Sequence, residues 1–264
     1  MRTTLILPAA TLLQRELTRF FRQPNRVIGA LATPLVFWVL IGSGMASSFR
    51  PASMPPGMTS MEYLFPGALT LIILFTSIFS TISIIEDRRE GFLQSVLVAP
   101  IFNAAVALGK ILGGAAVALI QAFLFLLLAP LVGIHWTAAS LAMIGLVVFL
   151  MAFALTGLGF VIAWRMDSVQ GFHAIMNLFL MPMWMLSGAL FPGAGAPAWL
   201  EWIMRFNPLT YGVTALRRTL YWPHSPFEWE LPSLAYALSV TVLFGLFFFA
   251  FSLWMVGKKR TAHG

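Results

Sequence analysis

The chain has 264 residues, of which 59% are hydrophobic and only 9% are charged, so it cannot form the water-soluble surface of an ordinary soluble domain. Its formal net charge of +7 would suggest a nucleic-acid binder if the chain were soluble. The charges lie at the ends of long apolar segments, however, which indicates a membrane protein and argues against a nucleic-acid partner.

Residues 1–25 are predicted to form an amphipathic helix in the membrane interface, closed by Pro24. Its polar face carries Arg15, Arg19 and Arg22, and its apolar face carries Leu13, Leu17, Phe20 and Phe21. The charges of Arg15, Glu16 and Arg19 interrupt the segment where a cleavable signal would be apolar. We expect this helix either to anchor the chain in lipid only or also to present its polar face to a cytosolic partner.

Intervals free of Asp, Glu, Lys and Arg locate the membrane spans, because a crossing helix needs about 20 mostly apolar residues. Four intervals provide one span each: Val27–Phe49, Tyr63–Ile85, Ser168–Leu200 and Leu231–Gly257. The interval Ile111–Trp164 is long enough for two spans, which a turn around Pro130, Gly133, His135 and Trp136 separates. The sequence therefore predicts an all-α integral membrane protein with six transmembrane helices.

The loop after the second span, residues 86–108, places charged residues before apolar ones. Its distinctive positions are Glu86, Arg88, Arg89, Glu90, Gly91, Phe92, Leu93, Leu97 and Pro100. Phe92, Leu93 and Leu97 follow helical spacing outside the membrane, where no lipid core can bury them. We expect them either to pack against the chain's own helix ends or to form a docking helix in the groove of a partner.

Residues 192–222, before the last span, are predicted to form an external re-entrant segment. The apolar stretch Phe206–Leu216 has only 11 residues between two arginines, which is too short to cross a membrane. Helix-breaking residues surround it: Pro192, Gly193, Gly195, Pro197, Pro208 and Pro223. Its other notable positions are Asn207 and Tyr211.

Six spans place both termini on one side, and the basic residues decide which side that is. The termini, the 86–110 loop and the 165–170 loop hold 12 of the 16 Lys and Arg residues, together with 5 acidic residues. The remaining 4 basic residues on the other side are balanced by 4 acidic residues. Excess positive charge marks the cytoplasmic face, so both termini are expected in the cytoplasm.

The sequence contains no recognisable nucleotide-binding or ion-coupling site that could supply energy for transport. Gly109-Lys110 is followed by Ile111 and lacks the first glycine of a phosphate-binding loop, and no charged residue lies at the centre of a span. The absence of cysteine excludes thiol catalysis and thiolate metal sites. The group His224, Glu228 and Glu230 is interpreted as an exposed loop, so no metal or other cofactor is expected.

A few polar residues lie inside the spans and either bridge helices or line a route for substrate. They are Gln121, Thr156, Asn177 and Ser187. An intramembrane serine protease is excluded, because Ser187 and His173 are 14 residues apart and lie about 21 Å apart on one continuous helix.

Four features follow one another in a specific order around the six spans. They are the amphipathic N-terminal helix, the Glu86–Pro100 loop with Gly91 and Leu93, the Met185-Leu186-Ser187-Gly188 end of span five before Phe191-Pro192, and the Asn207-Pro208-Leu209-Thr210-Tyr211 stretch. In this combination, over essentially its whole length, the chain resembles the membrane subunit of type 2 ATP-binding-cassette exporters. The similar branch includes drug-resistance and nodulation-factor export permeases.

The resemblance implies one transmembrane permease domain over residues 1–264, without an enzymatic activity of its own. It also implies a bacterial inner-membrane location, a second permease subunit in contact through spans one and five, and membrane lipids as surroundings. A separate cytosolic ATP-binding subunit would sit on residues 86–100, and residues 192–222 would face outside. The expected cargo is a lipid, a glycan or a drug-like molecule. The alternative that remains is a channel or secondary carrier that needs no ATPase.

Overall fold

The computed structural model describes residues 5–44, 54–190, 196–222 and 232–261, and in these ranges the chain is helical and has no strand. The α-helices are α1 (Ile6–Phe21), α2 (Pro24–Gly44), α3 (Ser60–Ser80), α4 (Ile82–Arg89), α5 (Phe92–Val98), α6 (Asn103–Leu126), α7 (Ala138–Arg165), α8 (Val169–Trp184), α9 (Ala198–Phe206), α10 (Pro208–Leu220) and α11 (Leu234–Thr261). A 3-10 turn, η1 (Ala129–Val132), follows α6, and a π turn, η2 (Met185–Ala189), extends α8.

Six of the described helical segments are long and apolar enough to cross a membrane. They are Val27–Gly44, Ser60–Arg89, Asn103–Leu126, Ala138–Arg165, Val169–Ala189 and Leu234–Lys258. The six-span, all-α prediction is therefore confirmed, including the turn between the third and fourth spans, where η1 reverses the chain.

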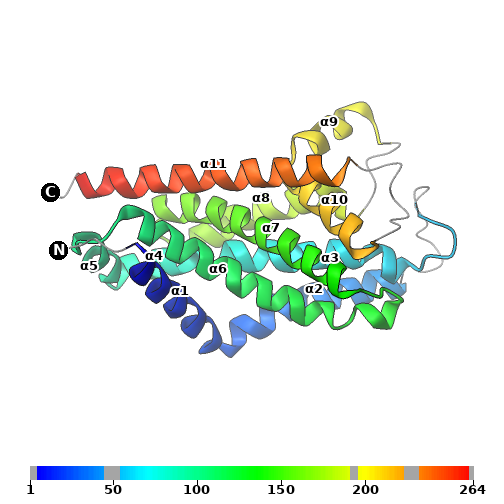
Figure 1. Ribbon diagram of the computed structural model, residues 1–264, viewed down its shortest axis with the longest axis horizontal. Coiled ribbons are helices and arrows are strands. Elements are labelled where there is room, and N and C mark those ends of the chain that lie inside the picture. Colours follow the sequence, from blue (N-terminus) through cyan, green and yellow to red (C-terminus); the bar gives the residue numbers. More distant parts are fainter. Residues whose placement is uncertain (1–4, 45–53, 191–195, 223–231, 262–264) are drawn as a thin grey trace.

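The spans run side by side along the long axis of the molecule (Figure 1). Both ends of the described chain lie at one end of this bundle, together with α1, α4 and α5; we call this the terminal end. The helices α9 and α10 lie at the opposite end, where α9 projects beyond α11 (Figure 1).

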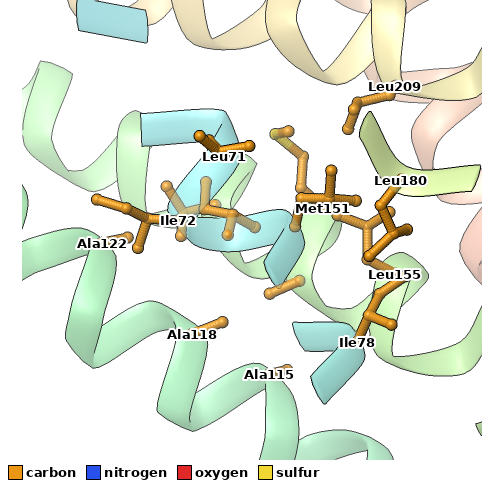
Figure 2. Packing of buried hydrophobic residues seen from close by; sticks show 14 of the residues in the cluster. Leu71, Ile72, Ile78, Ala115, Ala118, Ala122, Met151, Leu155, Leu180 and Leu209 are labelled. Atoms are coloured by element: carbon orange, nitrogen blue, oxygen red, sulfur yellow. The ribbon is translucent and has the colours of Figure 1, made fainter. Parts of the chain in front are cut away.

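The helix α3 forms the centre of the bundle and packs against α2, α6, α7, α8 and α10. Its neighbour α6 presents the small side chains of Ala115, Ala118 and Ala122 toward the hydrophobic core. Leu71 and Ile72 of α3 belong to the same core (Figure 2). Small residues on a helix face allow two backbones to approach closely in a membrane. The core of this protein is therefore built around α3 and α6.

Several helices are capped at their N-terminus by a hydroxyl side chain, which accepts a hydrogen bond from a backbone N–H group of the first turn. Thr59 accepts from the Glu62 amide at 3.2 Å before α3, and Ser168 accepts from the Gly171 amide at 3.2 Å before α8. Before α7, Thr137 forms a reciprocal capping box with Ser140. These caps fix where three of the spans begin.

The predicted ends of the spans differ from the observed ones at the terminal end. The second span continues through the charged residues to Arg89, and the third begins at Asn103 instead of Ile111, so that Lys110 lies inside a helix of the bundle. Charge-free intervals misplace these ends because several charged side chains are paired and buried inside the protein. Pro192, Gly193, Gly195, Pro223, His224, Glu228 and Glu230 lie outside the described residues.

Candidate functional site

The first helix lies directly on α6 at the terminal end. A Cβ atom placed on Gly109 would lie 2.6 Å from the Leu12 Cβ, and one on Gly113 would lie 2.7 Å from the Glu16 Cβ. No side chain fits at that separation, so the two glycines, one helical turn apart, form the contact surface for α1. This close approach brings the side chains of α1 within reach of polar groups on α4 and α6.

A cluster of five charged residues, which we call the ion cluster, forms at this contact. Its members are Arg15, Glu16 and Arg19 of α1, Asp87 of α4 and Lys110 of α6. The Arg15 guanidinium donates two hydrogen bonds to the Asp87 carboxylate, at 2.8 and 2.7 Å, and Arg19 donates a third at 2.8 Å. The Lys110 ammonium lies between the carboxylates of Glu16, at 2.5 Å, and Asp87.

The centre of the ion cluster is held away from water, while the Arg15 and Arg19 side chains at its edge are 31% and 17% exposed. The Asp87 side chain has no exposed surface, and those of Lys110 and Glu16 expose only 4% and 7%. Burial by itself lowers the pKa of the Arg15 guanidinium, but the hydrogen bonds and negative charge of Asp87 outweigh burial and raise that pKa above its ordinary value. Arg15 therefore stays charged and ties α1 to α4.

Two arginines of the predicted polar face of α1, Arg15 and Arg19, thus pair with the protein's own Asp87, whereas the third, Arg22, is exposed. Phe21, which was assigned to its apolar face, is exposed over 53% of its surface. Phe20 lines the cavity between α2, α3 and α8 that is described below. Asp87 and Lys110 were not among the predicted site residues, since nothing in the sequence pairs them; the Gly109 to Gly113 spacing was the available signal for a close helix contact.

Next to the ion cluster, Arg88 and Arg89 attach α4 to the turn between α7 and α8. The Arg88 guanidinium donates to the Met166 carbonyl at 2.9 Å and to the Asp167 carboxylate at 2.8 Å. Arg89 donates to the Asp167 carbonyl at 3.0 Å, while Glu90 lies at the exposed edge, 3.4 Å from Arg19. The charged loop therefore holds α1, α6 and the α7–α8 turn together.

After these charges, Gly91 adopts a φ of +78°, a conformation that side-chain-bearing residues rarely reach, and this turn directs the chain into α5. Leu93 and Leu97 are 2% and 7% exposed and belong to the protein's own core, as the self-packing hypothesis required. Phe92 is half-buried beneath the Arg15 guanidinium, 3.8 Å from its ring centre. Val98, in contrast, is 79% exposed.

An apolar groove of about 360 Å³ lies between α1 and α5. It is lined by Leu7, Pro8, Thr11, Leu12, Phe92, Ser95, Val96, Ala99 and Ile101. Leu7 of the lining is 70% exposed, and three apolar residues next in sequence to lining residues are exposed as well: Ile6 at 81%, Val98 at 79% and Phe102 at 48%. Pro100 is also exposed beside it. An exposed apolar patch of this kind marks a surface where a protein or a membrane binds.

A second cavity, of about 390 Å³, opens between α2, α3 and α8. Most of its lining is apolar, and the polar groups on it are Thr33, Thr76, Ser80 and His173. The helices α2 and α8 leave large apolar side chains uncovered on either side, including Val36 and Leu40 of α2 and Leu178 and Phe179 of α8.

The polar residues proposed to line a path are separated in the structure. Gln121 is buried and bridges helices: it accepts a hydrogen bond from Thr76 of α3 and donates to the Val27 carbonyl of α2 at 3.4 Å. The buried Ser187 donates to the Trp184 carbonyl at 2.6 Å. Asn177 lies on the exposed face of α8. The structure does not bring these three together.

The predicted re-entrant segment consists, in its described part, of α9 and α10 joined at Asn207. The Asn207 amide donates to the Met183 carbonyl of α8 at 2.6 Å, and its side-chain oxygen accepts from the Leu209 amide at 3.0 Å, which begins α10 with Pro208 in the first turn. The Tyr211 hydroxyl donates to the Arg205 carbonyl at 2.8 Å. This corner fixes α9 against the bundle.

Among the described residues, no group of three His, Asp and Glu side chains is arranged to hold a metal ion. The chemistry that the charged residues at the terminal end support is recognition and mechanical attachment. The apolar groove beside them provides a surface for a partner, and the cavity among α2, α3 and α8 provides room for an apolar molecule.

Comparison with known proteins also points to a membrane transport protein. The model of a family described as ABC-2 type transporter matches residues 9–221. The ycf38 transport permease of Cyanophora paradoxa is 26% identical over 231 residues, which cover 86% of this chain and 78% of that protein. Nodulation protein J of Rhizobium leguminosarum is 24% identical over 74% of each chain. The daunorubicin resistance ABC transporter permease protein DrrB1 of Streptomyces coeruleorubidus is 21% identical over 83% of this chain and 77% of that one.

Proposed function

Because the chain belongs to the ABC-2 type transporter family, we propose that this multi-pass permease subunit exports a lipid, glycan or drug-like substrate with energy from ATP hydrolysis on a separate cytosolic subunit. Related permeases are named for daunorubicin resistance and for nodulation, which supports a cargo of this kind. The proposal includes a bacterial inner-membrane location, cytoplasmic termini, two permease subunits in each exporter, and a single transmembrane domain over residues 1–264.

One observation carries the assignment of the ATPase contact: an apolar groove lies between α1 and α5 at the terminal end, beside the ion cluster, and the same segments expose further large apolar side chains. Leu93 and Leu97 hold α5 to the core, whereas Val98 and the groove-lining residues of α1 and α5, Phe92 among them, remain to meet a partner. The predicted coupling residues therefore divide into two groups: those that attach α5 to the spans and those that face the ATPase.

The ion cluster gives this contact a mechanical consequence. It joins α1, α4 and α6, and α4 is in turn attached to the α7–α8 turn through Arg88 and Arg89. A displacement of α1 or α5 by the ATPase would thus move α3, α6 and the start of α8 together. The cavity among α2, α3 and α8 lies next to these elements and would change its shape with them.

Pairing of two permeases through α2 and α8, the first and fifth spans, is supported by their exposure. Only 17% of the α2 window and 33% of the α8 window are buried inside one chain, against 83% for the second span. If two copies faced one another through these helices, the cavity among α2, α3 and α8 of each copy would be enclosed between them. The span α11 is equally uncovered and would face lipid.

Replacing Val98 by Asp tests the ATPase contact. The valine side chain is 79% exposed, so the charge should leave folding intact, but burying it in a partner groove should weaken the complex by about 2 kcal/mol or more. The measurement is the amount of ATP-binding subunit that co-purifies with the permease. Leu131→Asp is the matched control, because Leu131 is 80% exposed in η1, at the far end of α6. Full ATPase recovery with Val98→Asp would remove the proposed contact.

The orientation is tested by single cysteines, since the natural chain has none. Gln94 of α5 and Ala198 of α9 are both exposed, at the two ends of the bundle. In intact cells, a membrane-impermeant maleimide should label Ala198→Cys, and it should label Gln94→Cys only after the membrane is opened. Labelling of both variants in intact cells would contradict the six-span orientation with cytoplasmic termini.

A further inference from the structure

The last turn of α1 carries two adjacent phenylalanines with different surroundings. Phe20 is half-buried and lines the cavity of about 390 Å³ among α2, α3 and α8, whereas Phe21 is 53% exposed and lies outside that lining. Their rings meet edge-to-face, with centres 5.6 Å apart. Because neighbouring residues of a helix point about 100° apart, the fold turns only the Phe20 ring toward the cavity.

The cavity lies in the half of the bundle nearer the terminal end. Each helix contributes to it from its part near that end: α2 from positions between 29 and 34, α3 and α4 from positions between 75 and 82, and α8 from His173. Among the lining residues that the structure describes, Phe20 alone lies outside the six spans. It belongs to α1, which lies at the terminal end (Figure 1). The Phe20 ring therefore forms the wall of the cavity on the side of the proposed ATPase contact.

Arg19, the residue before Phe20, holds the last turn of α1 on α4. Its guanidinium donates to the Asp87 carboxylate at 2.8 Å and lies 3.2 Å from Glu86 and 3.4 Å from Glu90. The same turn thus carries an ionic attachment on one side and a cavity wall on the other. The position of the Phe20 ring therefore depends on where α1 lies against α4.

The connection between α1 and α2 is too short to absorb a movement of α1. It consists of Arg22 and Gln23. The Gln23 amide donates to the Phe20 carbonyl at 3.1 Å, and the Arg22 amide donates to the Thr18 carbonyl at 3.1 Å, so both residues extend the last turn of α1. A displacement of α1 therefore reaches Phe20 and the start of α2, which are two sides of the cavity, together.

The contact between α1 and α6 lies between the groove end of α1 and Phe20. Glu16 rests on Gly113 at this contact. Pro8, which lines the groove proposed for the ATPase, lies about 12 Å before Glu16 along the helix axis, and Phe20 lies about 6 Å beyond it. A rigid helix held near its middle tilts as a lever. A displacement of the groove end of α1 therefore moves Phe20 in the opposite direction, by about half as much.

We propose that Phe20 is a gating residue of the permease: its ring closes the cavity among α2, α3 and α8 toward the terminal end, and movement of α1 by the ATPase opens it. The inference rests on the proposed function. It adds a direct route from the ATPase contact to the cavity, separate from the route through α4 and the α7–α8 turn. In the described structure the ring lies at the cavity wall, which is the closed position.

A cysteine inside the cavity reports whether water-soluble molecules reach it, since the natural chain has no cysteine. Ser80 lines the cavity and is half-buried, so Ser80→Cys places a thiol of similar size there. The full exporter with this change is placed in lipid nanodiscs, where both faces are open to reagent. Mass spectrometry then measures the rate of thiol modification by a charged methanethiosulfonate, without nucleotide and with ATP and vanadate. The variants are Phe20→Ala and Phe20→Leu, and the matched control is Phe21→Ala.

With Phe20 in place, we expect slow modification without nucleotide and modification several-fold faster with ATP and vanadate. Phe20→Ala should be fast in both conditions, because alanine leaves the end of the cavity open. Phe20→Leu keeps a large apolar side chain and should retain most of the nucleotide dependence, and Phe21→Ala should behave as the protein with both phenylalanines. If Ser80→Cys does not fold, Thr33→Cys provides another thiol on the cavity wall.

Equal rates in Phe20→Ala and Phe21→Ala would show that Phe20 does not close the cavity. A rate that Phe20→Ala raises but nucleotide does not change, with the ATPase bound, would make the ring a fixed wall. Either result overturns the inference. The amount of ATP-binding subunit in the nanodiscs is measured separately, because its absence contradicts the proposed function. The comparison of Phe20→Ala with Phe21→Ala without nucleotide tests closure of the cavity in that case as well.

Discussion

Replacing Asp87 by Asn is expected to destabilise the protein strongly. The substitution keeps the shape of the side chain but removes the negative charge at the centre of the ion cluster. Arg19 then keeps Glu86, at 3.2 Å, whereas Arg15 and the buried Lys110 share Glu16 as the remaining anion of the cluster. Breaking a buried ion pair by removing one partner costs about 3–5 kcal/mol, because the other charges stay buried without compensation.

Thermal unfolding of the detergent-solubilised permease measures this effect. Glu90→Gln is the matched control: Glu90 lies one helical turn from Asp87 and also pairs with Arg19, but its side chain is 59% exposed. An exposed ion pair contributes about 0–1 kcal/mol, so the control should unfold close to the wild-type temperature. Equal unfolding temperatures for the two variants would mean that the ion cluster does not stabilise the fold.

Replacing Gly113 by Leu is expected to detach α1 from α6. Even a Cβ at this position would lie 2.7 Å from the Glu16 Cβ, and leucine adds three further carbons. Overpacking of this kind costs about 1–3 kcal/mol, and pulling Glu16 away from Lys110 adds the loss of a buried ion pair. The variant should therefore be less stable and should also expose the arginines of α1.

Limited trypsin digestion measures that exposure, because Arg15 and Arg19 are both bound to Asp87 in the intact structure. We expect faster cleavage after Arg19 in Gly113→Leu than in the wild type. Gly44→Leu serves as the control, since nothing lies within 4 Å of a Cβ at Gly44. Unchanged cleavage and stability in Gly113→Leu would contradict the assigned helix contact.

The number and approximate place of the spans follow from the sequence, because a membrane excludes charge along about 20 residues. The interval Tyr63–Ile85 falls within the observed span Ser60–Arg89, and the turn at Gly133 is recognisable from its residue types. Local chemistry determines these features. One sequence alone is therefore enough to predict them.

The pairing at the terminal end does not follow from the sequence in the same way. Asp87 is separated from Arg15 by 72 positions, and from Lys110 by 23. Whether a charged residue marks a water-exposed loop or a buried pair depends on which helices meet, and that depends on the tertiary packing. For the same reason, the spacing of Phe92, Leu93 and Leu97 did not reveal which of them would be buried.

The corner at Asn207 follows from the sequence only in part. A short apolar stretch flanked by prolines predicts a break, and Asn207 followed by Pro208 is a typical helix start. The hydrogen bond from Asn207 to the Met183 carbonyl joins segments 24 positions apart, which only the fold brings together. The break was therefore predictable, and the direction of α9 was not.

The central claim, that a separate ATPase binds at the α1–α5 end, is tested most directly by site-specific cross-linking. A benzophenone attached to Val98→Cys, and in a second sample to Leu131→Cys, is activated in membranes that contain the whole exporter. The account predicts an adduct from position 98, and none from position 131, with a chain that mass spectrometry identifies by its Gly-x4-Gly-Lys-Ser/Thr phosphate-binding loop. An adduct with that chain from position 131, or none from position 98 while the ATPase is present, would contradict the account.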